Sequence, residues 1–297
     1  MRDVRCAILG RPSCGKSTFV NTVCENKVSI VSSIPQSTLN SVNGAYTDKR
    51  GRIIFTDTPG IHIDERKFNT RLIKCAINAI RNADCVLYIL DACDEIGKEE
   101  EKTAFYAKTS LKPVIVLINK CDIAKSDNIA KKKAFVQNEL PSAKVFNGSA
   151  LNDEGLDEVL IEIFKYGSDV PKDSEEELFS TPWTDSDLEF RIKEEIREAV
   201  FENTKAEIPH SVYIEIENMA NSAGIISINA IIYTEQNSQK GILIGKGGSC
   251  IKAIRQLSQK KLKKIFPSFK VELLLEVKVD KNWKKNKQIL DKLNIGK

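Results

Sequence analysis

Short apolar runs alternate with amphipathic segments from the start of the chain to residue 166. Runs of strand length are separated by segments in which apolar residues recur with the period of a helix. This alternation predicts an α/β domain with a mostly parallel sheet and helices on both faces. A turn at 48–51 joins two extended runs, so one antiparallel strand is expected as well. The expected strands are 4–9, 41–47, 53–56, 85–91, 113–118 and 144–147, and the expected helices are 16–24, 69–82, 98–108, 130–140 and 154–166.

Beyond residue 168 the chain becomes acidic, polar and punctuated by proline. We interpret 169–185 as a linker between a first domain, 1–168, and a second domain, 186–297. The second domain opens with a helical period and acidic residues, as the helix dipole prefers. Two β-rich runs, a glycine turn leading into a basic helix, a strand and a closing basic helix follow, which predicts an α+β fold. These elements are expected at 185–204, 210–219, 226–234, 241–266, 269–279 and 281–293.

The charge of the chain is unevenly distributed. The net charge of the 297 residues is +4, but the segment from Lys240 to the end carries 16 Lys and Arg against 4 Asp and Glu, a net +12. The remainder therefore has a net charge of −8. A basic region attached to an acidic body is typical of a module that binds a polyanion. On charge alone, a solvated lysine face is an equally good interpretation.

The cysteines and the lack of long apolar runs indicate a cytoplasmic protein. The eight cysteines form no C-x-x-C pair, and Cys6, Cys85 and Cys93 fall on core-like strands. We interpret them as small buried hydrophobic residues in a reducing compartment rather than as disulfides or zinc ligands. There are only two histidines, so a histidine-based metal site is not expected. No apolar run reaches membrane-spanning length, and the first strand begins too early for a signal peptide to precede it.

The string GRPSCGKST at 10–18 matches the pattern G-x-x-x-x-G-K-[ST]. It lies between an apolar strand and a helix, where backbone N–H groups of a glycine-rich loop point at phosphate oxygens. Lys16 is expected to reach the β- and γ-phosphates, and the Ser17 hydroxyl to ligate Mg²⁺. A glycine-rich turn with a solvated lysine is the alternative from this motif alone. The expected phosphate-contacting residues are Gly10, Arg11, Pro12, Ser13, Cys14, Gly15, Lys16, Ser17 and Thr18.

A second motif makes this phosphate loop specific for guanine. The buried strand 113–118 ends in Asn119, Lys120 and, two residues later, Asp122. The Asp122 carboxylate can accept from both N–H donors on one edge of guanine, whereas adenine offers no such pair. Asn119 and Lys120 are expected to brace the loop and pack on the base.

Residues at the ends of two further strands complete the predicted nucleotide site. The Asp57 carboxylate is expected to hold Mg²⁺ through water, and the Gly60 N–H to sense the γ-phosphate. The Ala150 amide is placed to donate to guanine O6. Because four elements occur in the required order, the sequence predicts a GTPase that binds GTP or GDP with Mg²⁺. The nucleotide-contacting residues expected from these two elements are Asp57, Thr58, Pro59, Gly60, Ser149 and Ala150.

The second domain carries a glycine motif of its own, Gly245-Lys246-Gly247-Gly248. A GXXG turn at the start of a helix clamps about four nucleotides in KH domains, because glycine permits close approach and the helix N-terminus favours phosphate. The motif is weak alone, but the β-β-turn-helix-β order and the many lysines favour RNA binding over a flexible hairpin. The expected RNA-contacting residues are Gly245, Lys246, Gly247, Gly248 and Lys252.

Over essentially its whole length, the chain resembles the bacterial Era GTPases, which join a Ras-like G domain to a type II KH domain. The resemblance is carried by GRPSCGKST, PQST, DTPGIH, NKCD, GSAL, EIPHSVYIEIE, IGKGG..IK and VKV..NW. It implies GTP hydrolysis during maturation of the small ribosomal subunit, by a monomer whose KH domain holds single-stranded RNA near the 3′ end of 16S rRNA. It also implies catalytic roles for Lys16, Thr38 and Gly60, with Ser17, Thr38 and Asp57 around Mg²⁺. Some family members associate peripherally with the inner membrane.

Two departures from the family pattern, and one difference from Ras-like enzymes, change these expectations. Leu39 follows Thr38 where the family has arginine, and Ser13 stands where the family usually has asparagine. That asparagine helps to bind potassium in related GTPases, so potassium stays an open alternative here. Ile61 stands where Ras-like enzymes place a water-orienting glutamine, which predicts slow turnover accelerated by RNA. A membrane-associated GTP switch and a tRNA-directed GTPase remain alternative functions.

Overall fold

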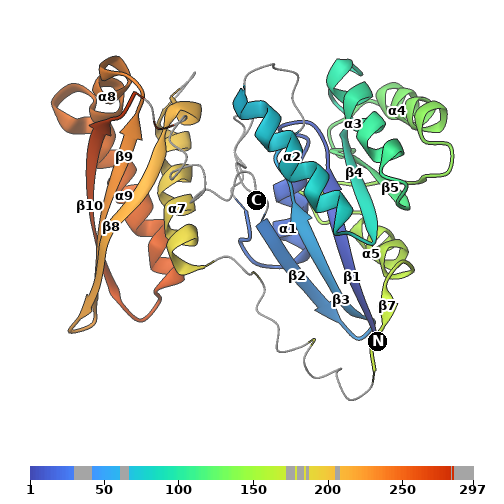
Figure 1. Ribbon diagram of the computed structural model, residues 1–297, viewed down its shortest axis with the longest axis horizontal. Coiled ribbons are helices and arrows are strands. Elements are labelled where there is room, and N and C mark those ends of the chain that lie inside the picture. Colours follow the sequence, from blue (N-terminus) through green and yellow to red (C-terminus); the bar gives the residue numbers. More distant parts are fainter. Residues whose placement is uncertain are drawn as a thin grey trace. The chain divides into compact units, whose positions relative to one another are not determined.

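The computed structural model describes residues 1–29, 42–60, 67–171, 178, 184, 187–204, 208–281 and 283. The chain divides into two compact units, one containing β1 to β7 and the other α7 to β10 (Figure 1). Several predicted features lie outside the described residues: Thr38, Leu39, Ile61, most of the linker at 169–185, and most of the closing helix at 281–293.

The described residues of the first unit form a seven-stranded sheet with the order β2-β3-β1-β4-β5-β6 and with β7 beside β1. The strands from β3 to β6 run parallel, while β2 is antiparallel to β3. The mostly parallel sheet is therefore confirmed. A second antiparallel pair, β7 with β1, was not predicted, because two residues are too few to show a period. The strands are β1 (Arg2–Leu9), β2 (Val42–Asp48), β3 (Gly51–Asp57), β4 (Cys85–Asp91), β5 (Val114–Asn119), β6 (Lys144–Asn147) and β7 (Ser168–Asp169).

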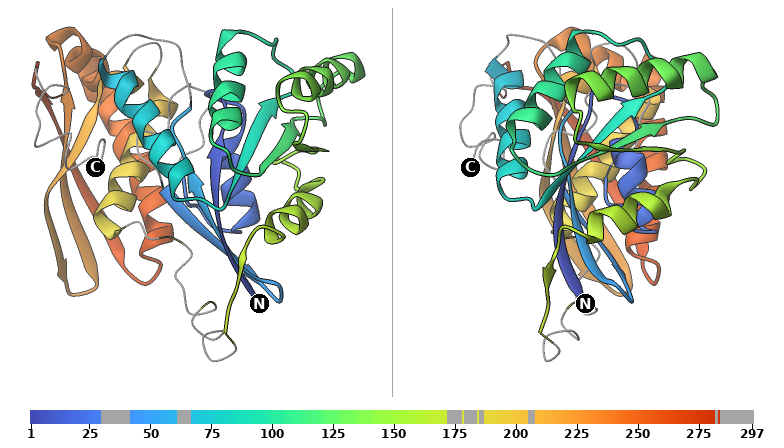
Figure 2. Two further views of the ribbon diagram at one scale, coloured as in Figure 1. Left: turned by 45° about the vertical axis from the view of Figure 1, so that its right-hand side comes forward. Right: turned by 90° about the vertical axis from the view of Figure 1, so that its right-hand side faces the viewer.

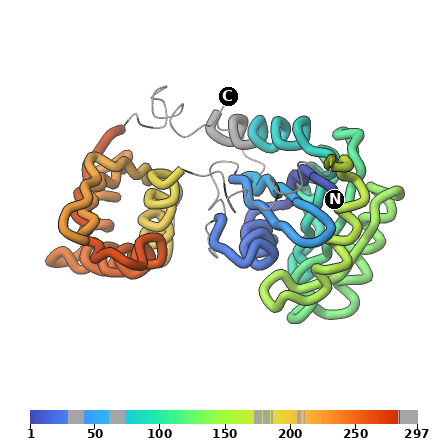
Figure 3. Tube along the Cα trace, turned by 90° about the horizontal axis from the view of Figure 1, so that it is seen from below, coloured from blue at the N-terminus to red at the C-terminus, as the bar shows by residue number. Residues whose placement is uncertain are grey.

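Helices cover both faces of this sheet (Figures 2 and 3). Buried side chains of α2, α3 and α4 form one core with alternate residues of β1, β4 and β5. On the opposite face, Phe19 of α1 meets Phe55 of β3 edge to face, and α5 packs nearby. Because both faces are covered, β4 is buried along its whole length. The helices are α1 (Lys16–Val23), α2 (Lys67–Arg81), α3 (Lys98–Thr109), α4 (Ser126–Glu139) and α5 (Leu156–Phe164).

Two sequence-based predictions in this unit were wrong in detail. Helix α4 begins at Ser126, four residues before the predicted start at Ala130, because its first turn is polar and gives no apolar period. Cys93 was expected on a core-like strand, but β4 ends at Asp91 and Cys93 is exposed. The Asp91 carboxylate accepts from the Cys93 N–H at 2.8 Å where the strand ends. All eight cysteines are free thiols.

The second unit is an α+β fold in which β9 lies between β8 and β10. Strand β9 is antiparallel to β8 and parallel to β10, and helices α8 and α9 make the crossover between the parallel pair. Helices α7 and α9 pack together and share one apolar core with the sheet. The elements are α7 (Leu188–Asn203), η2 (Pro209–Ser211), β8 (Tyr213–Ser222), β9 (Ile225–Thr234), α8 (Asn237–Ile244), η3 (Lys246–Gly248), α9 (Ser249–Ile265) and β10 (Lys270–Val279).

Helix α8 was not predicted from the sequence, which was interpreted as a turn leading directly into the basic helix. It has eight residues, and it contains Gly241 and two β-branched residues that disfavour helix. Its buried Leu243 and a capping box between Gln236 and Gln239 stabilise it instead. The Gln-x-x-Gln spacing was the available signal, although glutamine is an unusual N-cap residue. None of the described helices combines the length and apolar character that a membrane span requires.

Candidate functional site

The loop at 10–18 connects the carboxyl end of β1 to the first turn of α1 and is packed too closely for larger residues at its glycines. A Cβ on Gly15 would lie 2.2 Å from Asn119 Nδ2, and the φ of Gly15 is +100°. From the end of β3, Gly60 approaches so closely that a Cβ there would lie 2.6 Å from the Pro12 nitrogen. The loop is therefore fixed by its surroundings rather than by its own sequence alone.

Lys16 lies over this loop with its side chain buried. Its ammonium group donates to the carbonyl oxygens of Gly10, at 3.1 Å, and Arg11, at 2.7 Å. A buried cation inside a ring of loop backbone is suited to an anionic ligand, which would exchange with these two carbonyl oxygens.

A hydroxyl and a carboxylate face each other beside Lys16. Ser17 Oγ donates to Asp57 Oδ2 at 2.7 Å, and the Asp57 side chain is fully buried. The second carboxylate oxygen, Oδ1, is buried without a hydrogen-bond partner among the described residues. Burial raises the pKa of Asp57, while the charge of Lys16 and the Ser17 hydrogen bond lower it. An unsatisfied carboxylate oxygen next to a hydroxyl fits a hard divalent cation.

The Thr58 side chain forms a hydrogen bond inside the protein. Its hydroxyl is buried and donates to the Ile8 carbonyl oxygen at 2.6 Å. Any contact of Thr58 with a nucleotide must therefore come from its backbone.

The Asn119 amide joins three parts of the site. Its Nδ2 donates to the Cys14 carbonyl oxygen at 2.9 Å, and its Oδ1 accepts from the Ala150 N–H at 2.8 Å. Lys120 Nζ forms a second hydrogen bond with the loop, in which it donates to the Ser13 carbonyl oxygen at 2.9 Å. These contacts agree with the bracing expected of Asn119 and Lys120. The Ala150 N–H, which we expected to donate to guanine O6, donates to Asn119 Oδ1 in this structure.

The remaining residues of the predicted guanine site lie beside this junction. Asp122 is exposed just beyond β5, where its carboxylate can reach a ligand. Ser149 is buried, and its backbone pairs with Glu154 on both sides. The phosphate loop and the residues predicted to recognise guanine are thus contiguous.

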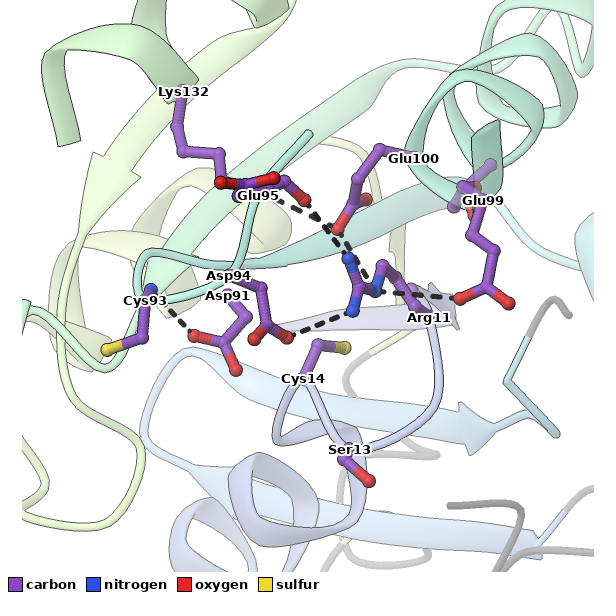
Figure 4. Close-up of polar contacts among 12 residues, drawn as sticks. Arg11, Ser13, Cys14, Asp91, Cys93, Asp94, Glu95, Glu99, Glu100 and Lys132 are labelled. Carbon is purple, nitrogen blue, oxygen red and sulfur yellow. Dashed lines mark hydrogen bonds and ion pairs between the residues drawn. The ribbon is translucent and has the colours of Figure 1, made fainter. Parts of the chain in front are cut away.

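The Arg11 side chain binds residues outside the phosphate loop. We expected Arg11 among the phosphate-contacting residues, and its guanidinium points toward acidic groups of the segment after β4 and of α3 (Figure 4). It donates to Asp94 Oδ2 at 3.0 Å and to the Glu95 carbonyl oxygen at 3.1 Å. Sequence reasoning missed these partners, although the acidic residues that follow a buried strand were a visible signal.

The glycine turn of the second unit has the geometry that the GXXG motif requires. The φ values of Gly245, Gly247 and Gly248 are +71°, +59° and +76°, in the left-handed region that favours glycine. A Cβ at Gly247 or Gly248 would meet nothing within 4 Å, so a ligand has room there. Lys246 is exposed in the turn, and Lys252 is exposed one turn into α9.

The basic residues of this unit do not all face a ligand. Lys261 of α9 bonds to Glu198 and Glu202 of α7, and Lys263 donates to the Phe269 carbonyl oxygen. These lysines stabilise the fold. The excess charge that remains for a polyanion is therefore smaller than the sequence count suggests.

The phosphate loop, the Ser17–Asp57 pair and the Asn119 junction lie at one edge of a mostly parallel sheet, and they define a P-loop GTPase. The second unit, with its α-β-β-α-α-β order and glycine turn, defines a KH domain. Two family models match the same parts of the chain: "50S ribosome-binding GTPase" over residues 5–120 and "KH domain" over residues 207–284. The chain belongs to the Era family of GTPases.

Relatives that match this chain along nearly their whole length support the assignment to the Era family. GTPase Era of Treponema denticola is 40% identical, over 97% of this chain and 97% of that protein. GTPase Era of Borreliella burgdorferi (strain ZS7) is 38% identical, over 99% of each. Among solved structures, Era in complex with MgGDPNP and nucleotides 1506–1542 of 16S ribosomal RNA is 28% identical with a TM-score of 0.92, and the match covers 100% of both chains. A point variant of Aquifex aeolicus Era bound to GDP·AlF4⁻ is also 28% identical, with a TM-score of 0.90 and the same coverage.

Proposed function

We propose that this protein binds and hydrolyses GTP in its first unit and binds single-stranded RNA through its second, during maturation of the small ribosomal subunit in the cytoplasm. The observation that carries the first half is the Asn119 amide. It bonds to the phosphate loop on one side and to Ala150 on the other, so one side chain joins phosphate and base recognition. We propose the domains 1–168 and 186–297 with a linker at 169–185, and the change from one compact unit to the other between residues 185 and 186 supports the start of the second domain.

In the phosphate part of the site, the backbone N–H groups of residues 10–18, except Pro12, bind the phosphates and Lys16 neutralises them. Ser17 and Asp57 would hold Mg²⁺, and Thr38 is the further ligand that the family resemblance implies. The metal ion supplies charge neutralisation on the phosphate oxygens. The unsatisfied Asp57 Oδ1 supports this assignment.

For hydrolysis, the residues of this chain act through position and charge. The Lys16 ammonium leaves the carbonyl oxygens of Gly10 and Arg11 and moves onto the β- and γ-phosphates. Gly60, held against Pro12, directs its N–H at the γ-phosphate. Preorganised donors of this kind stabilise the charge that spreads over the transferred group. With isoleucine at position 61, turnover is slow in the absence of RNA.

For base recognition, Asp122 accepts from the two guanine donors while Asn119 and Lys120 hold the loop that carries it. Ser149 and Ala150 form the opposite wall of the guanine site. When the Ala150 N–H donates to guanine O6, its hydrogen bond to Asn119 Oδ1 is either shared with the base or broken.

RNA binding is assigned to the turn Gly245–Gly248 and to Lys252. The exposed Lys246 and the open space at Gly247 support it. The RNA is proposed to be the 3′ region of 16S rRNA, because the related structure at 28% identity holds nucleotides 1506–1542 of that RNA. One of the family models is named for the 50S subunit, but the full-length relatives are Era proteins, and 16S rRNA belongs to the small subunit.

Hydrolysis by the intact protein tests the first half of this proposal. Lys16→Ala removes the cation from the loop and should reduce GTP turnover by at least about a hundredfold, since phosphoryl transfer depends on such charge stabilisation. Lys131→Ala, at an exposed position of α4, is the matched control and should retain full activity. Equal activity of the two variants in a phosphate-release assay would remove Lys16 from the mechanism.

A further inference from the structure

The backbone of the phosphate loop is held at four successive residues. Asn119 binds the Cys14 carbonyl oxygen, Lys120 binds the Ser13 carbonyl oxygen, and Gly60 packs against Pro12. Those three contacts come from the motifs that the sequence analysis identified. The fourth contact comes from the side chain of Arg11. Its partners, which follow β4 or lie in α3, belong to no nucleotide-binding motif.

The Arg11 guanidinium is surrounded by acceptors. Besides Asp94 and the Glu95 carbonyl oxygen, its Nε lies 3.6 Å from Glu100 Oε1 and 3.7 Å from Glu99 Oε2 (Figure 4). A planar guanidinium presents its donors in a fixed fork, so several acceptors fix its orientation as well as its position. The backbone of Arg11 is therefore tied to the start of α3.

The same backbone receives Lys16. The Arg11 carbonyl oxygen accepts from Lys16 Nζ at 2.7 Å, the shorter of the two carbonyl contacts that hold this ammonium group. One residue thus binds the acidic segment with its side chain and the phosphate-binding lysine with its backbone.

The acidic segment is anchored in turn. Asp91, at the end of β4, forms an ion pair with Lys120 and accepts from the Cys93 N–H at 2.8 Å. Lys120 and Arg11 therefore each connect the phosphate loop to the same segment, residues 91–95. On the α3 side, buried Glu100 accepts from Tyr88 Oη at 2.6 Å and lies 4.0 Å from buried Lys132 of α4. Burial raises the pKa of Glu100, while Tyr88, Lys132 and Arg11 oppose that rise.

We propose that Arg11 is a positioning residue whose side chain holds the phosphate loop in its nucleotide-binding shape and thereby slows nucleotide release. A preorganised loop loses little freedom when a ligand binds, whereas a loosened loop must be ordered again at each binding event. Differences in affinity between variants of one site lie mostly in the dissociation rate. This inference rests on the nucleotide site proposed above.

The test is the dissociation rate of a fluorescent GDP analogue, measured by chasing the preformed complex with unlabelled GDP. Arg11→Gln should release the analogue about tenfold faster than wild type, since it loses two charge-assisted hydrogen bonds and the ion pairs with Glu99 and Glu100. Arg11→Lys should be intermediate, because lysine keeps the charge but not the fork. Asp94→Asn, at a half-exposed position that leaves the fold intact, should give about a two- to threefold increase.

The matched control is Arg52→Gln. Arg52 forms a comparable two-point pair with Asp3, at 2.9 and 2.6 Å, at the start of β3 and away from the loop. It should lower the melting temperature about as much as Arg11→Gln while leaving the release rate at the wild-type value. If Arg11→Gln and Asp94→Asn both release GDP at the wild-type rate, Arg11 only stabilises the fold and the inference is wrong. Failure of the wild type to bind the analogue at all would instead overturn the proposed function.

Discussion

At the residue scale, Asn119 and Asp122 divide the guanine site between them. Asn119 is buried and bonded at both ends of its amide, while Asp122 is exposed. Asn119 therefore shapes the site, and we propose that Asp122 reads the base. The sequence alone predicted bracing by Asn119, because the types and order of the residues in this motif fit only a few kinds of site. It could not show that the Arg11 side chain binds Asp94 and the Glu95 carbonyl oxygen, since these residues lie more than eighty positions away.

Asp122→Asn should change which base is accepted. The amide presents a donor where guanine also donates, whereas xanthine offers an acceptor at that position. GTP affinity is expected to fall about a hundredfold, with a gain in affinity for xanthosine triphosphate. Parallel titrations with the two nucleotides measure this, and unchanged GTP affinity would contradict the role of Asp122.

Asn119→Ala should weaken both nucleotides alike. The change removes the bonds to the Cys14 carbonyl oxygen and the Ala150 N–H, and it leaves a gap beside Gly15. Because neither bond touches the base, GTP and xanthosine triphosphate affinities should both fall by about ten- to a hundredfold. The same pair of titrations reports this, and a loss confined to GTP would show that Asn119 reads the base directly.

At the element scale, hydrophobic periodicity predicted the strands and most helices of both units, because each has one or two buried faces. It failed where packing rather than period decides. Helix α8 is short, contains Gly241, and is stabilised by buried Leu243 and a capping box. Strand β7 has two residues and exists through its pairing with β1. The glycine turn between α8 and α9 was predicted correctly in position, and its left-handed backbone explains why three glycines occur there.

This turn gives a prediction about RNA affinity. Lys246→Asp places a carboxylate at the start of α9, where phosphate is expected, and should lower affinity for a single-stranded RNA at least about tenfold. The slope of log affinity against log salt concentration should also become shallower by about one, which corresponds to the loss of one phosphate contact. Lys264→Asp, an equal charge change at the exposed far end of α9, is the control and should have a smaller effect. Binding isotherms at two salt concentrations compare them. Identical behaviour of the two variants would mean that the basic charge of α9 acts only as a diffuse field.

At the scale of the whole molecule, two activities are assigned to two folded units of one chain. The sequence predicted this division from a change of pattern and an acidic-to-basic shift in charge. The shift overstated the charge available to RNA, because Lys261 forms ion pairs with Glu198 and Glu202. Sequence counts charges, but only the fold shows which of them are already paired.

The most direct measurement for the whole account is crosslinking of the intact protein to cellular RNA in the presence of a non-hydrolysable GTP analogue, followed by sequencing of the bound RNA. We expect enrichment of the 3′ region of 16S rRNA, with loss of that enrichment in Lys246→Asp but not in Lys264→Asp. Enrichment of tRNA, or no enrichment of 16S rRNA above background, would show that the proposed RNA target is wrong.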